Sequence, residues 1–241
     1  MGLRTLTARS VVLSGLLGTH PPRLSPRKLV RLGELFEIAE GTIRVALSRM
    51  TATGDLIQRD GWYELPRRLV ERQERQDESR KPQERPWHGT WDMIVVTADR
   101  RERTNRAVFR KSMLNLLLAE LREGVWLRPD NLVRSLPEST VGDCAAFTVG
   151  PVSDPAALAA ELWDLDEWAR RARLLLHAME STSGIADSFM VSAAVLQHLL
   201  ADPVLPAELL PAHWPGASLR TAYDRFDADH RALLDEYLDI D

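Results

Sequence analysis

A helix pattern that runs directly into a hairpin pattern, within residues 38–65, constrains the fold most strongly. Ile43, Leu47 and Met50 recur at the spacing that places apolar side chains on one face of a helix. Asp60 and Gly61 follow, and an Asp-Gly pair is a preferred two-residue turn between antiparallel strands. A short helix followed by such a hairpin predicts a winged helix-turn-helix domain.

The other face of this helix is small, polar and basic, a composition that suits the major groove of DNA. That groove is about 12 Å wide, and arginine side chains reach guanine edges within it. We therefore expect DNA contacts from four helix residues and the hairpin tip: Thr42, Arg44, Ser48, Arg49 and Arg59. The alternative for each residue is a solvated surface side chain.

Three other residues of this segment have alternative roles. Glu40 either accepts a hydrogen bond from a cytosine amino group or pairs with Arg44 one helical turn later. Trp62 is expected in the core of the hairpin rather than against DNA, whereas Tyr63, on the opposite face of the strand, suits either place.

The charge distribution supports a DNA-binding role for the first part of the chain. The 241 residues carry a net charge of −4, but residues 1–68 contain 11 basic and 6 acidic side chains. Residues 151–241 contain 6 basic and 16 acidic side chains. Because the local field attracts phosphate, the basic segment is expected to meet nucleic acid and the acidic segment is not.

The sequence predicts an α+β protein divided into four parts. Residues 1–68 form the winged helix-turn-helix domain, and residues 69–86, almost without apolar side chains, form a linker. Residues 87–165 alternate strand and helix patterns in the order β-α-β-β-α, with one long helix over residues 101–121, which predicts a ferredoxin-like domain. Residues 166–241 form a helical domain for dimerisation or effector binding.

Several classes of protein are disfavoured by what the sequence lacks. No apolar run approaches the roughly 20 residues needed to span a bilayer, so we expect a cytoplasmic protein without membrane contact. Cys144 is the single cysteine, and the six histidines have no metal-ligand spacing. No nucleotide-binding or hydrolase fingerprint is present, so we expect no enzymatic activity and no cofactor.

Three segments, in this order along most of the chain, together resemble the PaaX family of phenylacetic acid degradation repressors. The first contains Ala46-Leu47-Ser48-Arg49. The second opens its strand with Trp91 and continues to Gly124-Val125-Trp126 and Pro129, and the third is DPVLPAELLPAHWPG at residues 202–216. The resemblance implies a homodimeric repressor of a catabolic operon, with a central Cas2-like ferredoxin fold, that an aryl-CoA thioester releases from DNA.

A homodimer would read an inverted repeat of double-stranded DNA, because one recognition helix contacts only a few base pairs. The apolar segments 174–179 and 196–200 are candidates for the dimer interface, with a place in the intrachain core as the alternative. A CoA thioester needs cationic and aromatic partners. The candidate effector residues are Trp91, Arg101, Arg103, Arg106, Arg110 and Trp126. Their alternatives are a solvated basic helix face for the arginines and a place in the core for the tryptophans.

Two other functions compete with the regulator. A Cas2-like metal-dependent nuclease would use Asp92 or Asp99 beside the first strand of the central domain, although no second acidic partner is identifiable. An interaction adaptor would carry a winged helix that no longer binds DNA. Failure of the folded protein to bind DNA at low salt would favour the adaptor.

Overall fold

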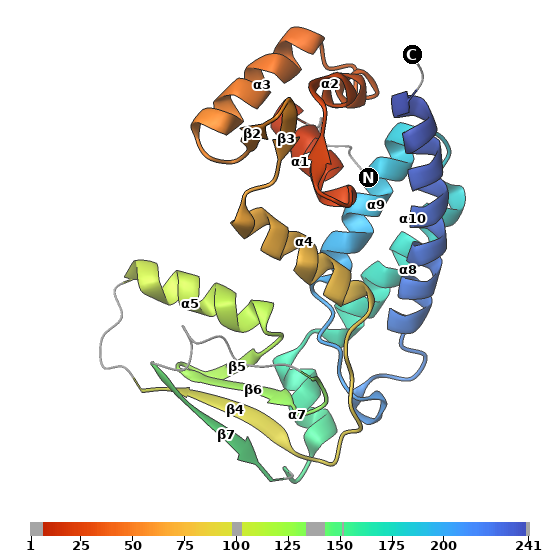
Figure 1. Ribbon diagram of the computed structural model, residues 1–241. Coiled ribbons are helices and arrows are strands. Elements are labelled where there is room, and N and C mark those ends of the chain that lie inside the picture. Colours follow the sequence, from red (N-terminus) through yellow and green to blue (C-terminus); the bar gives the residue numbers. More distant parts are fainter. Residues whose placement is uncertain (1–6, 98–102, 134–142, 151, 240–241) are drawn as a thin grey trace. The chain divides into compact units, whose positions relative to one another are not determined.

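The computed structural model describes residues 7–97, 103–133, 143–150 and 152–239, with side chains omitted for residues 103–105 (Figure 1). Contacts within the chain divide it into two compact units. Unit 1 comprises residues 1–80, 175–200 and 218–241, and unit 2 comprises residues 81–174 and 201–217. Segments far apart in the sequence therefore fold together in each unit.

Unit 1 begins with three helices and a small antiparallel sheet, which we call the head. Its elements are α1 (Ala8–Gly18), β1 (Arg23–Leu24), α2 (Pro26–Glu34), α3 (Glu40–Ala52), β2 (Ile57–Arg59) and β3 (Trp62–Glu64). Ser25 caps α2 by accepting a hydrogen bond from the Lys28 amide, and Pro26 occupies the first helical turn. The predicted sequence of helices and hairpin is confirmed, and β1 adds a third strand in the order β1-β3-β2.

The three helices of the head share one hydrophobic core with the hairpin. It contains Val12 and Leu16 of α1, Leu29 of α2, and Ile43 and Leu47 of α3, none of them more than 2% exposed. Their burial fixes α3 against α1 and α2 by one face only. The other face of α3 stays at the surface.

Gly33 on α2 allows α3 to approach closely. A Cβ atom at this position would lie 2.5 Å from Cγ1 and 2.7 Å from Cδ1 of the buried Ile43. We expect Gly33→Ala to lower the free energy of unfolding by about 1 kcal/mol, because overpacking outweighs the gain in helix propensity. Gly18→Ala on α1 is the control, since its Cβ would meet nothing within 4 Å. Urea denaturation checks both variants, and equal effects at the two positions would contradict the packing argument.

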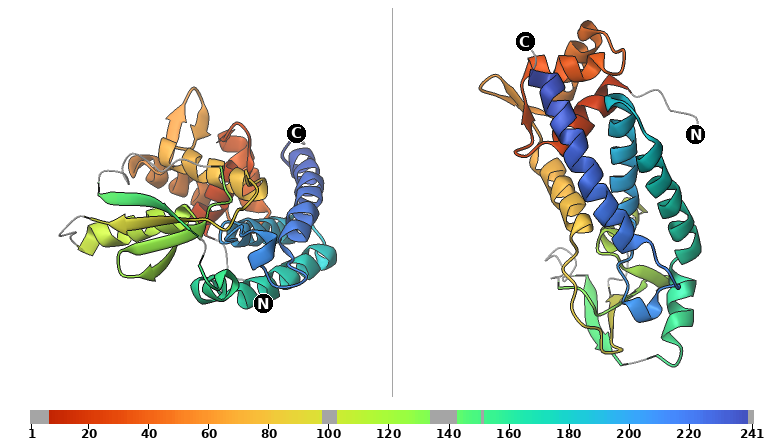
Figure 2. Two further views of the ribbon diagram at one scale, coloured as in Figure 1. Left: turned by 90° about the horizontal axis from the view of Figure 1, so that it is seen from below. Right: turned by 90° about the vertical axis from the view of Figure 1, so that its right-hand side faces the viewer.

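Three further helices complete unit 1: α4 (Arg67–Arg80), α9 (Ile185–Leu199) and α10 (Gly216–Asp239), of which α10 belongs to it from residue 218. Helix α8 (Leu165–Ser181) passes into unit 1 at residue 175. Helices α9 and α10 run side by side (Figures 1 and 2), and Phe189 and Leu238 pack with Leu32 of α2. The segment expected to be a linker thus contains helix α4. Its buried Gln73 donates hydrogen bonds to the carbonyl oxygens of Leu17 and Thr19 at 2.8 and 2.9 Å.

His230 on α10 is a buried titratable group in unit 1, 5% exposed and stacked on Phe226. Burial lowers the pKa of His230, and nearby Asp227 opposes this shift while Arg231 adds to it. The unfolded chain therefore binds a proton more readily than the folded chain as the pH falls below about 6.5. As the pH falls through that range, we expect His230 to lower the free energy of unfolding by at most about 1.4 kcal/mol for each pH unit. Denaturation between pH 7.5 and 5.5 should show less acid sensitivity in His230→Gln than in His177→Gln, which alters an exposed histidine.

Unit 2 is built on a four-stranded antiparallel sheet in the order β5-β6-β4-β7. Its elements are β4 (Trp91–Val96), α5 (Arg103–Asn115), β5 (Ala119–Arg122), β6 (Val125–Pro129), β7 (Cys144–Val149), α7 (Pro155–Leu162) and the short helix η1 (Ala207–Leu209). With β4 and β6 inside and the first helix between β4 and β5, this order confirms the ferredoxin-like fold class.

The sequence prediction missed β5 and made the preceding helix too long. Helix α5 ends at Asn115, not at residue 121, because Leu117 adopts a positive φ of 56° and turns the chain. Strand β5 then pairs with β6 through a hairpin at Gly124, whose φ is +79°. The apolar run of residues 116–118 fits a helix as well as a strand, so periodicity alone did not locate the boundary.

Each face of this sheet carries its own core. Ile94 and Trp126 pack under Met113 of α5, whereas Trp91 and Leu127 pack with α7 and η1 on the opposite face. Trp91 and Trp126 are therefore both buried, one on each face of the sheet. In the described parts of the chain, no helix combines the length and the apolar character that a membrane span requires.

Candidate nucleic-acid interface

Helix α3 presents an exposed surface opposite its buried stripe. Thr42, Arg44, Ser48 and Arg49 are all exposed, as the sequence pattern predicted. Val45 lies on the same surface and is 50% exposed, although it was not among the expected contact residues. An exposed valine between polar and basic neighbours suits apolar contact with a thymine methyl group.

Glu40 and Arg44 form an ion pair at the start of this surface. The Nη2 and Nε atoms of Arg44 both lie 2.6 Å from Oε1 of Glu40, and both side chains are more than half exposed. Of the two alternatives for Glu40, the structure shows the ion pair with Arg44. An exposed pair at this spacing contributes only about 0.3–0.5 kcal/mol, so it opens at little cost when Arg44 finds another anion.

Removing the charge of Glu40 is expected to strengthen DNA binding. Glu40→Gln frees Arg44 and removes a carboxylate that phosphates would repel, so we expect about three- to tenfold tighter binding to any duplex. Fluorescence anisotropy on specific and scrambled duplexes measures the change. A loss of affinity confined to sites with one particular cytosine would instead assign Glu40 a base contact.

The hairpin places Arg59 at its tip. Strands β2 and β3 pair with Arg59 opposite Trp62, and the intervening Asp60 and Gly61 both have positive φ, of 50° and 80°. Two successive positive φ values define the turn type that an Asp-Gly pair favours. Two adjacent residues were therefore enough to predict this turn. Arg59 is exposed, as expected for a phosphate contact.

The expectation for Trp62 was wrong. Trp62 is 37% exposed, and the guanidinium of Arg23 lies 5.3 Å from the centre of its ring, whereas Tyr63 packs against the core of the head. The reason is strand β1, which pairs Leu24 with Tyr63 and sets which face of β3 meets the core. Strand β1 has only two residues, too few to give an alternating pattern in the sequence, so its pairing with β3 was not predicted.

Asp55 fastens the end of α3 to its neighbours. Arg9 donates to its carboxylate at 2.9 Å, and Arg68 pairs with the same carboxylate and donates to the Gly54 carbonyl oxygen at 3.1 Å. Hydrogen bonds from Arg9, and then from Arg68, hold the pKa of Asp55 below its ordinary value. These two arginines of the basic segment thus stabilise the head.

Two of the candidate effector residues of unit 2, Trp91 and Trp126, do not share a surface. Trp91 and Trp126 are 0% and 2% exposed and lie on opposite faces of the sheet, so no single ligand contacts both. Arg106 pairs with Glu123 at 3.6 Å. Arg110 pairs with Glu120, and its guanidinium lies 5.5 Å from the ring centre of Trp126. Arg101 and the side chain of Arg103 lie outside the described residues.

The nuclease alternative finds no cluster of ligands. Among the described residues, no group of three or more His, Cys, Asp or Glu side chains is placed to hold a metal ion. Asp92 is half-buried on β4. Asp99, the alternative to Asp92, lies outside the described residues.

The chain thus combines a three-helix head with a hairpin, a ferredoxin-like sheet and C-terminal helices. Family models match these parts in order: "PaaX-like protein" at residues 7–69, "PaaX protein central Cas2-like domain" at 84–143 and "PaaX-like protein C-terminal domain" at 160–239. Together they cover most of the sequence. The chain belongs to the PaaX family.

A solved structure is similar to this chain in both sequence and fold. It is described as "Uncharacterized protein Rv0674 from Mycobacterium tuberculosis", with 45% identity and a TM-score of 0.77. The match covers 96% of this chain and 98% of that chain. Its description names no activity, and a comparison with curated proteins gives no match.

Proposed function

We propose that the protein is a sequence-specific DNA-binding transcriptional regulator, a cytoplasmic repressor of a catabolic operon. Membership of the PaaX family suggests a regulator of phenylacetic acid catabolism rather than an enzyme. The observation that carries the proposal is the exposed face of α3, where Thr42, Ser48 and Arg49 surround Val45 beside an exposed hairpin tip.

The test of this proposal is a mobility shift with the DNA upstream of the gene. We expect a shifted band at low salt, a scrambled duplex that competes poorly, and an affinity that falls steeply as salt rises. Circular dichroism of the same preparation shows that the protein is folded. Folded protein without a shifted band would refute DNA binding and leave the interaction adaptor as the better account.

We further infer that two copies read an inverted repeat whose half-sites are about one helical turn, or a multiple of it, apart. Of the segments expected at the dimer interface, Met179 and Leu199 are 8% and 1% exposed, so they belong to the core of unit 1. Leu174 is 58% exposed and remains available. Light scattering should give twice the 27.2 kDa chain mass, and a monomer that DNA leaves unchanged would contradict this.

Release from DNA by a small molecule completes the proposed function. An aryl-CoA thioester is the effector that the family suggests, and its phosphates need several cations. The arginines of α5 are the candidates for that role, of which Arg106 and Arg110 have acidic partners. A mobility shift with and without phenylacetyl-CoA tests whether the thioester releases the operator.

A further inference from the structure

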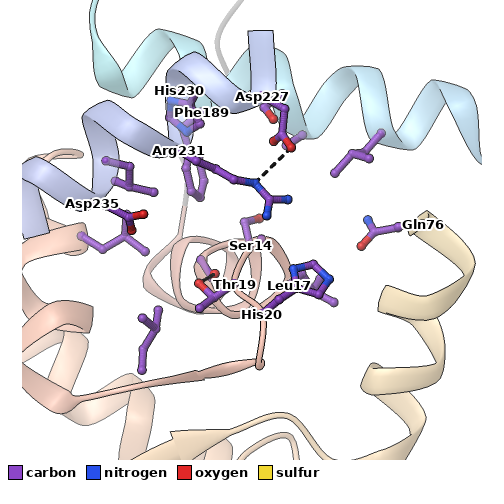
Figure 3. Close-up of a pocket in the computed structure, with 18 of the residues that line it drawn as sticks. Ser14, Leu17, Thr19, His20, Gln76, Phe189, Asp227, His230, Arg231 and Asp235 are labelled. Carbon is purple, nitrogen blue, oxygen red and sulfur yellow. Dashed lines mark hydrogen bonds and ion pairs between the residues drawn. The ribbon is translucent and has the colours of Figure 1, made fainter. Parts of the chain in front are cut away.

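A cavity of about 450 Å³ lies inside unit 1, between the head and helices α4, α9 and α10 (Figure 3). Every residue that lines it belongs to unit 1. Its volume falls within the range of about 300–1,000 Å³ that is typical of small-molecule sites. The DNA-contact hypothesis does not use this cavity.

One wall of the cavity is apolar. Leu32 of α2, Phe189 of α9, and Leu234 and Leu238 of α10 line it and form one hydrophobic cluster. The cluster is contributed by the head and by the C-terminal helices, which lie about 150 residues or more away in the sequence. This wall suits the apolar body of a ligand.

The remaining lining carries buried polar groups that lack partners. Gln76 and His230 are 7% and 5% exposed, and neither Oε1 of Gln76 nor Nδ1 of His230 has a hydrogen-bond partner among the described residues. Nε of Arg231 lies 3.0 Å from Oδ2 of Asp227, but its N–H makes no hydrogen bond there. A buried polar group without a partner is costly, so Oε1 of Gln76 and Nδ1 of His230, which line one cavity, point to a bound molecule that supplies partners.

Figure 3 shows how these groups are arranged. Gln76 extends from α4 on one side, and Arg231 reaches into the space from α10, where a dashed line joins it to Asp227. The ring of His20, after the end of α1, is drawn between them in this view. The polar groups therefore come from different elements and face a common space.

The charges around the cavity favour an anion. Five Lys and Arg residues line it against three Asp residues. Asp227 is shared, because Nη1 of Arg80 lies 3.1 Å from the same oxygen that Arg231 approaches. Burial, together with the negative charge of Asp227, raises the pKa of Tyr223, so its hydroxyl stays protonated and donates to Asp227 at 3.2 Å.

We propose that this cavity is the effector site and that its ligand is a compact organic acid with an apolar body. The carboxylate accepts hydrogen bonds from Arg231 and from the neutral ring of His230, and the apolar body packs against Leu32, Phe189 and Leu234. The inference rests on the proposed function only in calling the ligand an effector. Binding itself follows from the cavity.

The position of the cavity connects such a ligand to the DNA-contact surface. Leu32 lines the cavity, and its neighbour Gly33 is the residue against which Ile43 of α3 packs. Trp62 of the hairpin also lines the cavity. A ligand that displaces the Leu32 side chain therefore acts on the helix and the hairpin that are proposed to contact DNA.

Thermal unfolding of the full chain tests the ligand class without DNA. The probes are phenylacetate and hexanoate as apolar acids, phenylacetamide as the uncharged analogue, and phenylacetyl-CoA. We expect at least one acid to raise the unfolding midpoint by about 5 °C at 100 times its Kd, and the amide to have no effect. No shift with either acid at millimolar concentration, or a shift with the thioester alone, would overturn the proposal.

Two variants locate the site. Arg231→Gln is expected to weaken acid binding at least tenfold, whereas Arg225→Gln, on the same helix but outside the cavity, leaves it unchanged. Ala193→Phe fills the cavity from the exposed side of α9 without changing the charge and should also weaken binding. Unchanged acid affinity in both Arg231→Gln and Ala193→Phe would place the site elsewhere.

Operator release is measured separately by a mobility shift with the acid that binds. Acid binding without DNA binding would refute the proposed regulator function and support the ligand site. DNA binding without acid binding would refute the ligand site and support the proposed regulator function. Acid binding that leaves the operator complex intact would overturn the effector role.

Discussion

Val45→Glu is expected to weaken binding to the upstream DNA by about 100-fold or more. The side chain is 50% exposed at the centre of the proposed contact surface, so a carboxylate there would meet the phosphates or base edges of the groove. Like charges brought together in an interface cost several kcal/mol, and 1.4 kcal/mol corresponds to a factor of ten. Fluorescence anisotropy at constant salt gives the affinity.

Val108→Glu is the matched control for this variant. Val108 is 62% exposed on α5 of unit 2, so the same substitution adds the same charge without touching α3. Both variants should unfold at the wild-type midpoint, because neither position is buried. Equal losses of affinity would mean that net charge, and not the surface of α3, controls binding.

Asp227→Ala should have the largest effect on stability. Asp227 is 6% exposed and accepts from Tyr223, while Arg80 and Arg231 lie 3.1 and 3.0 Å from its carboxylate. Its removal leaves these groups of α4 and α10 without their shared anion. We expect the free energy of unfolding to fall by about 3 kcal/mol, near the lower end for a broken buried ion pair.

The expected loss of stability in Asp227→Ala is near the lower end of this range because Arg80 keeps a second partner, Asp224, at 2.7 Å. Asp229→Ala, at an exposed position on the same helix, controls for removal of a carboxylate and should change the free energy by less than about 0.5 kcal/mol. Urea denaturation at pH 7 measures both variants. A loss below 1 kcal/mol for Asp227→Ala would show that water replaces the network at little cost.

The sequence predicted the features whose signals are local. Ile43, Leu47 and Met50 repeat within one helix, and the Asp60-Gly61 turn is encoded by two adjacent residues. The exposed face of α3 follows from the same periodicity, because the side chains that are not buried must point outward. Membership of the family rested on motifs spread along the chain, and the family models confirmed it.

The features that were missed depend on contacts between distant residues. The exposure of Trp62 depends on β1, and the burial of Gln73 depends on α1, more than 50 residues earlier. Arg80 and Asp224 are 144 residues apart, so no periodic pattern could connect them. The cavity of unit 1 exists only because such distant segments pack together, so no pattern in the sequence indicated it.

The central claim, that the exposed face of α3 reads base sequence, is tested most directly by the specificity ratio of an Arg49→Ala variant. Anisotropy titrations on the upstream DNA that gives a shifted band and on a scrambled duplex of equal length give this ratio at one salt concentration. We predict a wild-type ratio of about 10³ or more, and a variant that loses roughly 1–3 kcal/mol on the operator but much less on the scrambled duplex. Equal losses on both duplexes would contradict base reading by Arg49.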